Sequence, residues 1–326
     1  MYVATNPGGN APDGPQFGSP SQVFAYSPAG RLERSYVIRG QDLASTERPA
    51  YGLQALALDR EGLLYIVDKA PGRIVRLDPR TGLQTDYASF PDVRPCGLTR
   101  SRQCSATRRD LRAFPNYLTF APDGGLYVSD FQQALVWRVP QGGGVARVAF
   151  TDRRLDSGQG PNGVGVLRDG PTLVFAQVVN PPGVGVPEAG CLYPLRIRQN
   201  GQLDRLRKLY ESRPGDGPDG FAVAASGNVY LNLALANQVA VISPEGEEVA
   251  RVGARTGGLN GTEVPFDGPA SAAFAGRRLL VTNQAVSTRE PNAFAVLDVL
   301  AGEDGLALFR PRIRPHWEHS RSSRDA

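Results

Sequence analysis

The chain has 326 residues, a formal net charge of +4, a pI of about 9.1, 38 glycines and 27 prolines. Such a composition favours many short strands joined by tight turns, and no stretch shows sustained helical periodicity or the apolar length of a membrane span. Lysine occurs only at positions 69 and 208 and the arginines are scattered, so no phosphate-binding stripe is present. We therefore expect a soluble all-β protein that neither inserts into membranes nor binds nucleic acid.

A short apolar stretch with a variable second residue recurs along the chain. The end of a second apolar stretch follows that residue after 13 to 15 positions, as Leu126 to Asp130 follow Asn116. This constant spacing predicts a repeated β-hairpin. We call the first apolar stretch of each repeat its opener. The variable second residues of the five openers are Gln54, Asn116, Asn162, Asp219 and Ala270.

The openers are 46 to 62 residues apart, and each repeat continues with two more strand-like stretches, such as 135–139 and 146–150. Four strands in a repeat of this length predict a blade of a β-propeller. With an N-terminal blade, the repeats predict a six-bladed β-propeller with four antiparallel strands per blade. We expect one domain over residues 1–313, whose last blade closes through 293–300 and 306–313, and a polar tail over 314–326.

The N-terminal blade is expected to lack its innermost strand. Residues 1–5 align with the second strand of the other blades, and the spacing places the missing opener upstream of Met1. We hypothesise that the natural chain starts further upstream, behind an export signal. The alternative is a form that folds with a gap in its first blade.

The connections fall into two classes. Turns between first and second strands and between third and fourth strands are short, whereas several of the other connections are long: 6–21, 91–115, 178–190 and 284–292. In an up-and-down blade the two classes emerge on opposite faces, so we place function on the long-loop face.

Two of the three cysteines, Cys96 and Cys104, lie in one loop and could close a small ring. A disulfide there would pin the loop 91–115 and would indicate an oxidising compartment; free thiols in a cytoplasmic protein are the alternative. Cys191 has no evident partner. We expect an extracytoplasmic location, periplasmic or secreted, with the cytoplasm as the alternative.

The opener residues also form the candidate site. Openers start the innermost strands, so Gln54, Asn116, Asn162 and Asp219 are expected to present oxygen atoms to one point in the central channel. Oxygen ligands of mixed charge suit Ca²⁺, or Mg²⁺ with more retained water. The alternative is that Asn and Asp beside Pro and Gly cap turns.

The openers, followed by strands such as Leu126-Tyr-Val-Ser-Asp130, resemble the six-bladed propellers of the senescence-marker-protein, gluconolactonase and luciferin-regenerating-enzyme family. The chain is also similar to strictosidine-synthase-like and paraoxonase-like propellers. The resemblance implies a divalent cation held by a Glu, one or two Asn and an Asp. Pro-Asn-Gly at Asn162 and Pro-Asp-Gly at Asp219 match the family motif.

Two openers depart from the family pattern. Asn116 matches in position, but Tyr117 replaces a small residue, and Gln54 stands where the family has a Glu. Asp219 is then the only carboxylate of the four. We therefore expect weaker binding of a divalent cation, because charge count largely sets the strength of calcium sites.

The resemblance implies a metal-dependent hydrolase of lactones or related esters, in which Asp219 is a metal ligand or the base that orients water. The alternative is a non-catalytic monomeric propeller that binds a small ligand or a protein partner on its long-loop face. Strictosidine-type condensation would need a channel carboxylate that we do not identify. Both histidines, His316 and His319, lie in the tail, which excludes a Ser-His-Asp triad in the core and leaves a transition metal without a third ligand.

Overall fold

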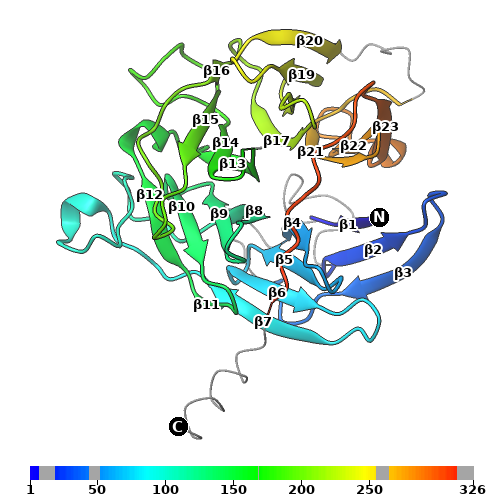
Figure 1. Ribbon diagram of the computed structural model, residues 1–326, viewed down its shortest axis with the longest axis horizontal. Coiled ribbons are helices and arrows are strands. Elements are labelled where there is room, and N and C mark those ends of the chain that lie inside the picture. The colour runs from blue at the N-terminus through cyan, green and yellow to red at the C-terminus, as the bar shows by residue number, and fades with distance from the viewer. Residues whose placement is uncertain (7–18, 44–51, 168, 255–263, 314–326) are drawn as a thin grey trace, which may run out of the picture.

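The computed structural model describes residues 1–6, 19–43, 52–167, 169–254 and 264–313. Apart from three short 3-10 helices, Cys96–Leu98, Arg153–Leu155 and Pro291–Ala293, the regular structure of these residues is β, in six sheets around one axis (Figure 1). The predicted six-bladed β-propeller is thus confirmed. No helix within the described ranges has the length and apolar character needed to cross a membrane.

Four blades have four antiparallel strands in chain order from the axis outward. Blade 2 contains β4 (Leu53–Leu58), β5 (Leu64–Asp68), β6 (Arg73–Leu77) and β7 (Gln84–Ser89). Blade 3 contains β8 (Pro115–Phe120), β9 (Leu126–Asp130), β10 (Leu135–Val139) and β12 (Arg147–Thr151). Blade 4 contains β13 (Pro161–Val166), β14 (Thr172–Gln177), β15 (Cys191–Arg196) and β16 (Tyr210–Glu211). Blade 5 contains β17 (Pro218–Val223), β18 (Val229–Leu233), β19 (Gln238–Ile242) and β20 (Glu248–Gly253).

Blades 1 and 6 have three strands each. Blade 1 contains β1 (Tyr2–Ala4), β2 (Gln22–Tyr26) and β3 (Leu32–Val37). Blade 6 contains β21 (Pro269–Ala275), β22 (Arg278–Asn283) and β23 (Val296–Leu300). In the described part of the chain no strand pairs with β1 on its axial side, as the spacing predicted. A short strand, β11 (Gly144–Val145), pairs with β7 in parallel and links blade 3 to blade 2.

The prediction of a fourth strand at 306–313 was wrong. Residues 301–313, which we call the C-terminal strap, instead cross the short-turn face (red in Figure 1). The amide of Leu306 donates to Val223 O of blade 5, and Pro311 O accepts from Arg60 N of blade 2 at 3.0 Å. Pro311 has no N–H to donate to a strand ladder, which disfavours a continuous strand in this segment.

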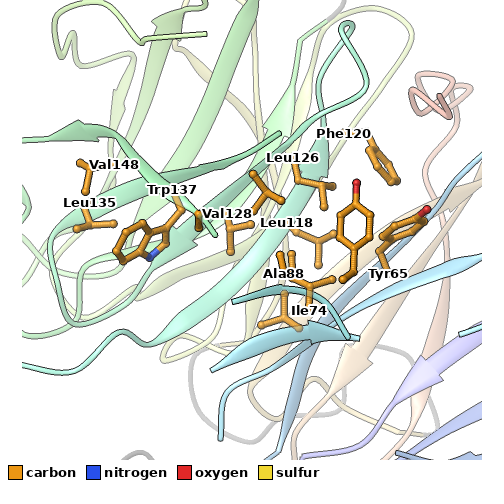
Figure 2. Packing of buried hydrophobic residues seen from close by; sticks show 14 of the residues in the cluster. Tyr65, Ile74, Ala88, Leu118, Phe120, Leu126, Val128, Leu135, Trp137 and Val148 are labelled. Atoms are coloured by element: carbon orange, nitrogen blue, oxygen red, sulfur yellow. The ribbon is translucent and has the colours of Figure 1, made fainter. Parts of the chain in front are cut away.

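The core lies between neighbouring blades. Between blades 2 and 3, Tyr65 packs edge-on against Phe120, with 5.1 Å between ring centres, and Trp137 is fully buried in the same cluster (Figure 2). Ile313 of the strap joins this cluster. Because full burial of one such side chain contributes about 1.5–3 kcal/mol, these interfaces fix each inner strand relative to the next.

The polar residue that ends a second strand has a structural role in blade 3. The carboxylate of Asp130 accepts from Phe114 N and from Trp137 Nε1, both at 2.9 Å. Burial raises the pKa of Asp130 to about 6, against the lowering effect of these hydrogen bonds. Asp130 thereby anchors the backbone that leads into the opener at Asn116.

The predicted disulfide between Cys96 and Cys104 is confirmed, with 4.9 Å between the two Cα atoms. It closes a ring within the loop that leads to β8. Cys191 is a buried free thiol that donates to Asn180 Oδ1 at 3.3 Å.

Candidate active site at the ring axis

Every complete inner strand carries a β-bulge at its opener. In β17, Pro218 pairs with Leu233, but Phe221 pairs with Leu231, so β17 has one extra residue in this interval. The same shift occurs in β4, β8, β13 and β21. Bulges redirect side chains and interrupt the ladder. The shared bulge is the physical basis of the spacing that marks the openers in the sequence.

Three opener side chains form a hydrogen-bonded series across blades 3, 4 and 5. Asn116 Nδ2 donates to Asn162 Oδ1 at 2.7 Å, and the side chain of Asn162 is hydrogen-bonded to the carboxylate of Asp219. Asn116 and Asn162 are buried, whereas Asp219 keeps a partly exposed surface. We call these three residues the axial site.

The surroundings of Asp219 make it the titratable group of the axial site. Burial raises its pKa to about 7, although hydrogen bonds from Gly220 N and from Asn162 act in the opposite direction. Asp219 thus exchanges a proton near neutral pH while solvent still reaches part of it. A carboxylate in this state can act as a general base or as an ionised ligand.

The bulge glycines let the inner strands approach closely. A Cβ on Gly163 would lie 2.6 Å from Asp219 O, and one on Gly220 would lie 2.3 Å from Tyr117 Oη. Real side chains do not tolerate such contacts. Glycine after Asn162 and after Asp219 is therefore required by the packing of the inner strands.

Tyr117 crosses the ring axis on the short-turn side of the axial site. Its hydroxyl donates to Ala270 O at 3.0 Å and is hydrogen-bonded to the hydroxyl of Ser271, so it joins blade 3 to the opposite blade 6. Burial raises the pKa of Tyr117 well above its usual value, and the nearby Asp219 adds to this effect. Tyr117 is therefore neutral, and its hydroxyl is held beside the first residues of β21. The sequence had marked Tyr117 only as a departure from the family pattern.

Gln54 is held by a residue outside the openers. Gln54 Oε1 accepts from Asn6 Nδ2 at 2.8 Å, and the described residues show no hydrogen bond from Gln54 to the axial site. Asn6 precedes a long loop and stands where Lys69 and Phe131 stand in blades 2 and 3, so the spacing of the repeats could not single it out.

Asn232 is a further polar residue that the sequence did not reveal. It lies opposite the bulge of β17, fully buried, and neither of its side-chain polar atoms has a hydrogen-bond partner in the described structure. At the equivalent positions, Ser129 and Thr282 accept from the bulge amides of Tyr117 and Ser271. The amide of Gly220 instead donates to Asp219, which leaves Asn232 unpaired beside the axial site.

The ligand atoms that the axial site offers are of the type that binds a hard cation. Asn116, Asn162 and Asp219 offer only oxygen ligands, as Ca²⁺ prefers. Among the described residues no three His, Cys, Asp or Glu side chains gather as a metal site, so a cation here would depend on amide oxygens and a single negative charge. Two surface hollows, of about 410 and 300 Å³, involve none of the opener residues.

Fold and site together define a six-bladed propeller with a polar cluster at the ring axis. The model of the SMP-30/gluconolactonase/LRE-like region matches residues 97–284, and the chain belongs to this family. The predicted family resemblance is thus confirmed. A comparison with curated proteins found no match.

Solved structures share the fold at low sequence identity. A calcium-binding protein, regucalcin, from Agrobacterium tumefaciens is 18% identical with a TM-score of 0.60, over 90% of this chain and 86% of that one. A gluconolactonase from Xanthomonas campestris is 19% identical with a TM-score of 0.53, over 82% and 77%. A virginiamycin B lyase from Staphylococcus aureus is 15% identical with a TM-score of 0.51, over 85% and 76%. The propeller alone therefore does not specify the reaction.

Proposed function

We propose that this protein is a metal-dependent hydrolase of lactones or related esters, with calcium or another divalent cation at the ring axis. The observation that carries the proposal is the hydrogen-bonded series from Asn116 through Asn162 to Asp219. These three residues would hold the cation, with Gln54 as a fourth oxygen donor. Family membership and the similarity to a gluconolactonase support the reaction class.

The chain's own residues account for proton transfer and positioning. When bound, a divalent cation supplies Lewis-acid polarisation of a carbonyl. Asp219 is either a ligand of the cation or the base that accepts the proton of a water molecule attacking this carbonyl, and its pKa of about 7 in the absence of a cation suits the second role. Asn162 orients the carboxylate through its hydrogen bond.

A non-catalytic propeller that binds a small ligand or a protein partner is the second candidate. The observation that favours it is Gln54, whose carbonyl oxygen accepts from Asn6 and adds no charge to the site. With a single carboxylate, the site would bind a divalent cation weakly or not at all.

Calorimetric titration with calcium, combined with hydrolysis of a lactone panel, tests both candidates. We expect wild type to bind calcium, Gln54→Glu to bind it more tightly because a second charge is added, and Asp219→Asn to lose binding and hydrolysis together. Asn200→Asp, a charge change at an exposed turn whose hydrogen bond from Gln202 N an aspartate keeps, is the matched control. Equal calcium affinity in wild type and both site variants would refute the cation site, and binding without hydrolysis would support the non-catalytic candidate.

We also propose an extracytoplasmic location, a single domain over residues 1–313, a small-molecule ligand and a monomeric state. The disulfide between Cys96 and Cys104 supports the location, because such bonds persist mainly in oxidising compartments.

A further inference from the structure

A disulfide-closed lobe projects from the rim of blade 3. We call residues 94–105 the cysteine lobe, because the bond between Cys96 and Cys104 closes its base. Two backbone hydrogen bonds beside the disulfide, of 2.7 and 3.0 Å, hold the ends of the lobe together. Gln103 Oε1 accepts from Val148 N of β12 at 2.7 Å, which fixes the lobe to the outermost strand of the blade. The lobe therefore stands beside the ring, beyond β12 at the left of Figure 1.

The lobe and its flanks carry a high density of positive charge. Residues 92–112 contain six arginines and two aspartates, a net charge of +4, which equals the formal net charge of the whole chain. Over the chain as a whole the arginines are scattered, so this density emerges only when the disulfide defines the loop as one unit. Within the lobe Arg94, Arg100 and Arg102 are exposed, and in the described structure none of their side chains has an ion-pair or hydrogen-bond partner.

The ring between the two cysteines is too small to spread these charges far apart. The cysteines are eight positions apart, so no residue between them lies more than four positions from the disulfide, or about 14 Å at full extension. The Debye length at physiological ionic strength is about 8 Å. The three guanidinium groups can therefore all come within a Debye length of one flat surface.

A large apolar side chain stands among these arginines. Leu98 ends the 3-10 helix Cys96–Leu98, and 68% of its surface is exposed. The two surface hollows found in the described structure include no residue of the lobe, so they offer no groove there for a polymeric anion. An exposed apolar residue beside cationic side chains is typical of proteins that lie at the interface of an anionic bilayer. The cations bind lipid phosphate there, while the apolar side chain leaves water.

We propose that the cysteine lobe docks the protein on the surface of a bilayer that contains anionic phospholipids. Arg94, Arg100 and Arg102 donate hydrogen bonds to phosphate oxygens, and Leu98 enters the headgroup region. The disulfide sets the shape of the lobe before binding, so little conformational entropy is lost on docking. No part of the chain has to span the bilayer. The inference goes beyond the proposed hydrolysis, since it requires neither a bound cation nor turnover.

Sedimentation with unilamellar vesicles tests the proposal, in buffer that contains EDTA and no substrate. We expect wild type to bind vesicles of phosphatidylcholine with about 30% phosphatidylglycerol, and not vesicles of phosphatidylcholine alone. Binding should weaken as sodium chloride is added, because salt screens the attraction. One arginine near an anionic surface contributes about fivefold in affinity, so a triple variant should bind about 100-fold more weakly. This lobe variant combines Arg94→Gln, Arg100→Gln and Arg102→Gln.

A matched control removes the same charge elsewhere. It combines Arg31→Gln, Arg60→Gln and Arg207→Gln, three exposed arginines in connections of blades 1, 2 and 4. Its affinity should stay within about threefold of wild type, because these arginines lie outside the lobe. Failure of wild type to bind the anionic vesicles, or equal weakening in both triple variants, would overturn docking by the lobe.

Leu98→Ser distinguishes a lipid surface from a soluble polyanion. Its binding to anionic vesicles should weaken about tenfold, because most of a leucine side chain no longer leaves water on docking. Its binding to dextran sulfate should equal that of wild type. Wild-type binding to dextran sulfate without binding to anionic vesicles would overturn the lipid assignment. Because metal and substrate are absent throughout, these outcomes are independent of calcium binding and of hydrolysis.

Discussion

At the scale of single residues, Asp219 is the group whose charge decides what the axial site can bind. Its carboxylate is the only negative charge among the five opener residues, and burial holds its pKa near 7. A cation and a proton therefore compete for the same carboxylate. We therefore expect calcium binding to depend on pH through Asp219, which contributes to the pH dependence of folding stability together with Asp130, whose pKa burial raises to about 6.

We expect the apparent calcium affinity to rise about tenfold per pH unit below pH 7 and to level off above it. In the absence of calcium, the free energy of unfolding changes with pH in the opposite direction and falls as the pH rises. Because the folded-state pKa of Asp219 is raised, its stabilising contribution is complete below about pH 4 and is lost as the pH rises through 7. Calorimetric titrations and urea unfolding between pH 5 and 8 measure both effects. Asp219→Asn should abolish calcium binding and remove this residue's share of the pH dependence of stability, and an affinity in wild type that does not change with pH would contradict the assignment.

The sequence predicts a site residue when that residue occupies the same position in several blades. Asn116, Asn162 and Asp219 stand at one phase of the repeat, so their hydrogen-bonded series follows from spacing. Asn6 follows the second strand of blade 1 at the phase that Lys69 occupies in blade 2, but the residues at this phase differ from blade to blade, so the repeat does not mark Asn6 as the residue that holds Gln54.

At the scale of strands, the β-bulge of each inner strand redirects the opener side chain, and this is how a repeated hairpin contributes a residue to the axial site. In β13 and β17 the bulge requires glycine, at Gly163 and Gly220, because a neighbouring inner strand and Tyr117 occupy the space of a side chain. The sequence predicted the inner hairpins well, since each is local and closed by a short turn. Outer strands were less predictable: β16 has two residues, and 306–313 forms none, because an outermost strand has one neighbour and little burial to define it.

Replacement of Gly220 by alanine tests the crowding at the axis. Its Cβ would lie 2.3 Å from Tyr117 Oη and 2.5 Å from Ala270 O, so we expect Gly220→Ala to lower the free energy of unfolding by about 1–3 kcal/mol. Gly97→Ala is the matched control, because a Cβ there meets no atom within 4 Å, and its effect should stay within about 0.5 kcal/mol. Urea unfolding measures both variants. Equal stabilities would mean that the strands do not pack this closely.

At the scale of the whole molecule, the C-terminal strap joins opposite sides of the ring. Its backbone is hydrogen-bonded to blades 5 and 6 through residues 304–306 and to blade 2 through Pro311, while Ile313 packs between blades 2 and 3. Blades 1 and 6 have three strands each in the described structure, so the strap adds contacts across the ring that the blades themselves do not supply.

We expect a chain that ends after Gly302 to lose about 4 kcal/mol of stability, about 1 for each of the four backbone hydrogen bonds that residues 303–313 make. A chain that ends after Ile313 keeps all of these contacts and is the matched control. Thermal unfolding of both forms measures the difference. Similar melting temperatures would show that the strap does not hold the ring together.

The strap also affects the order of events during synthesis. Chains emerge from the ribosome at about 5–20 residues per second, and the inner hairpins, whose contacts are local, can form as they appear. The hydroxyl of Tyr117, by contrast, can form its hydrogen bonds only after Ala270 and Ser271 have been synthesised, more than 150 positions later. The strap is synthesised after blade 6. A nascent chain therefore holds most of its blades before it holds a finished site. Any activity at the ring axis would begin only once translation has passed the last blade.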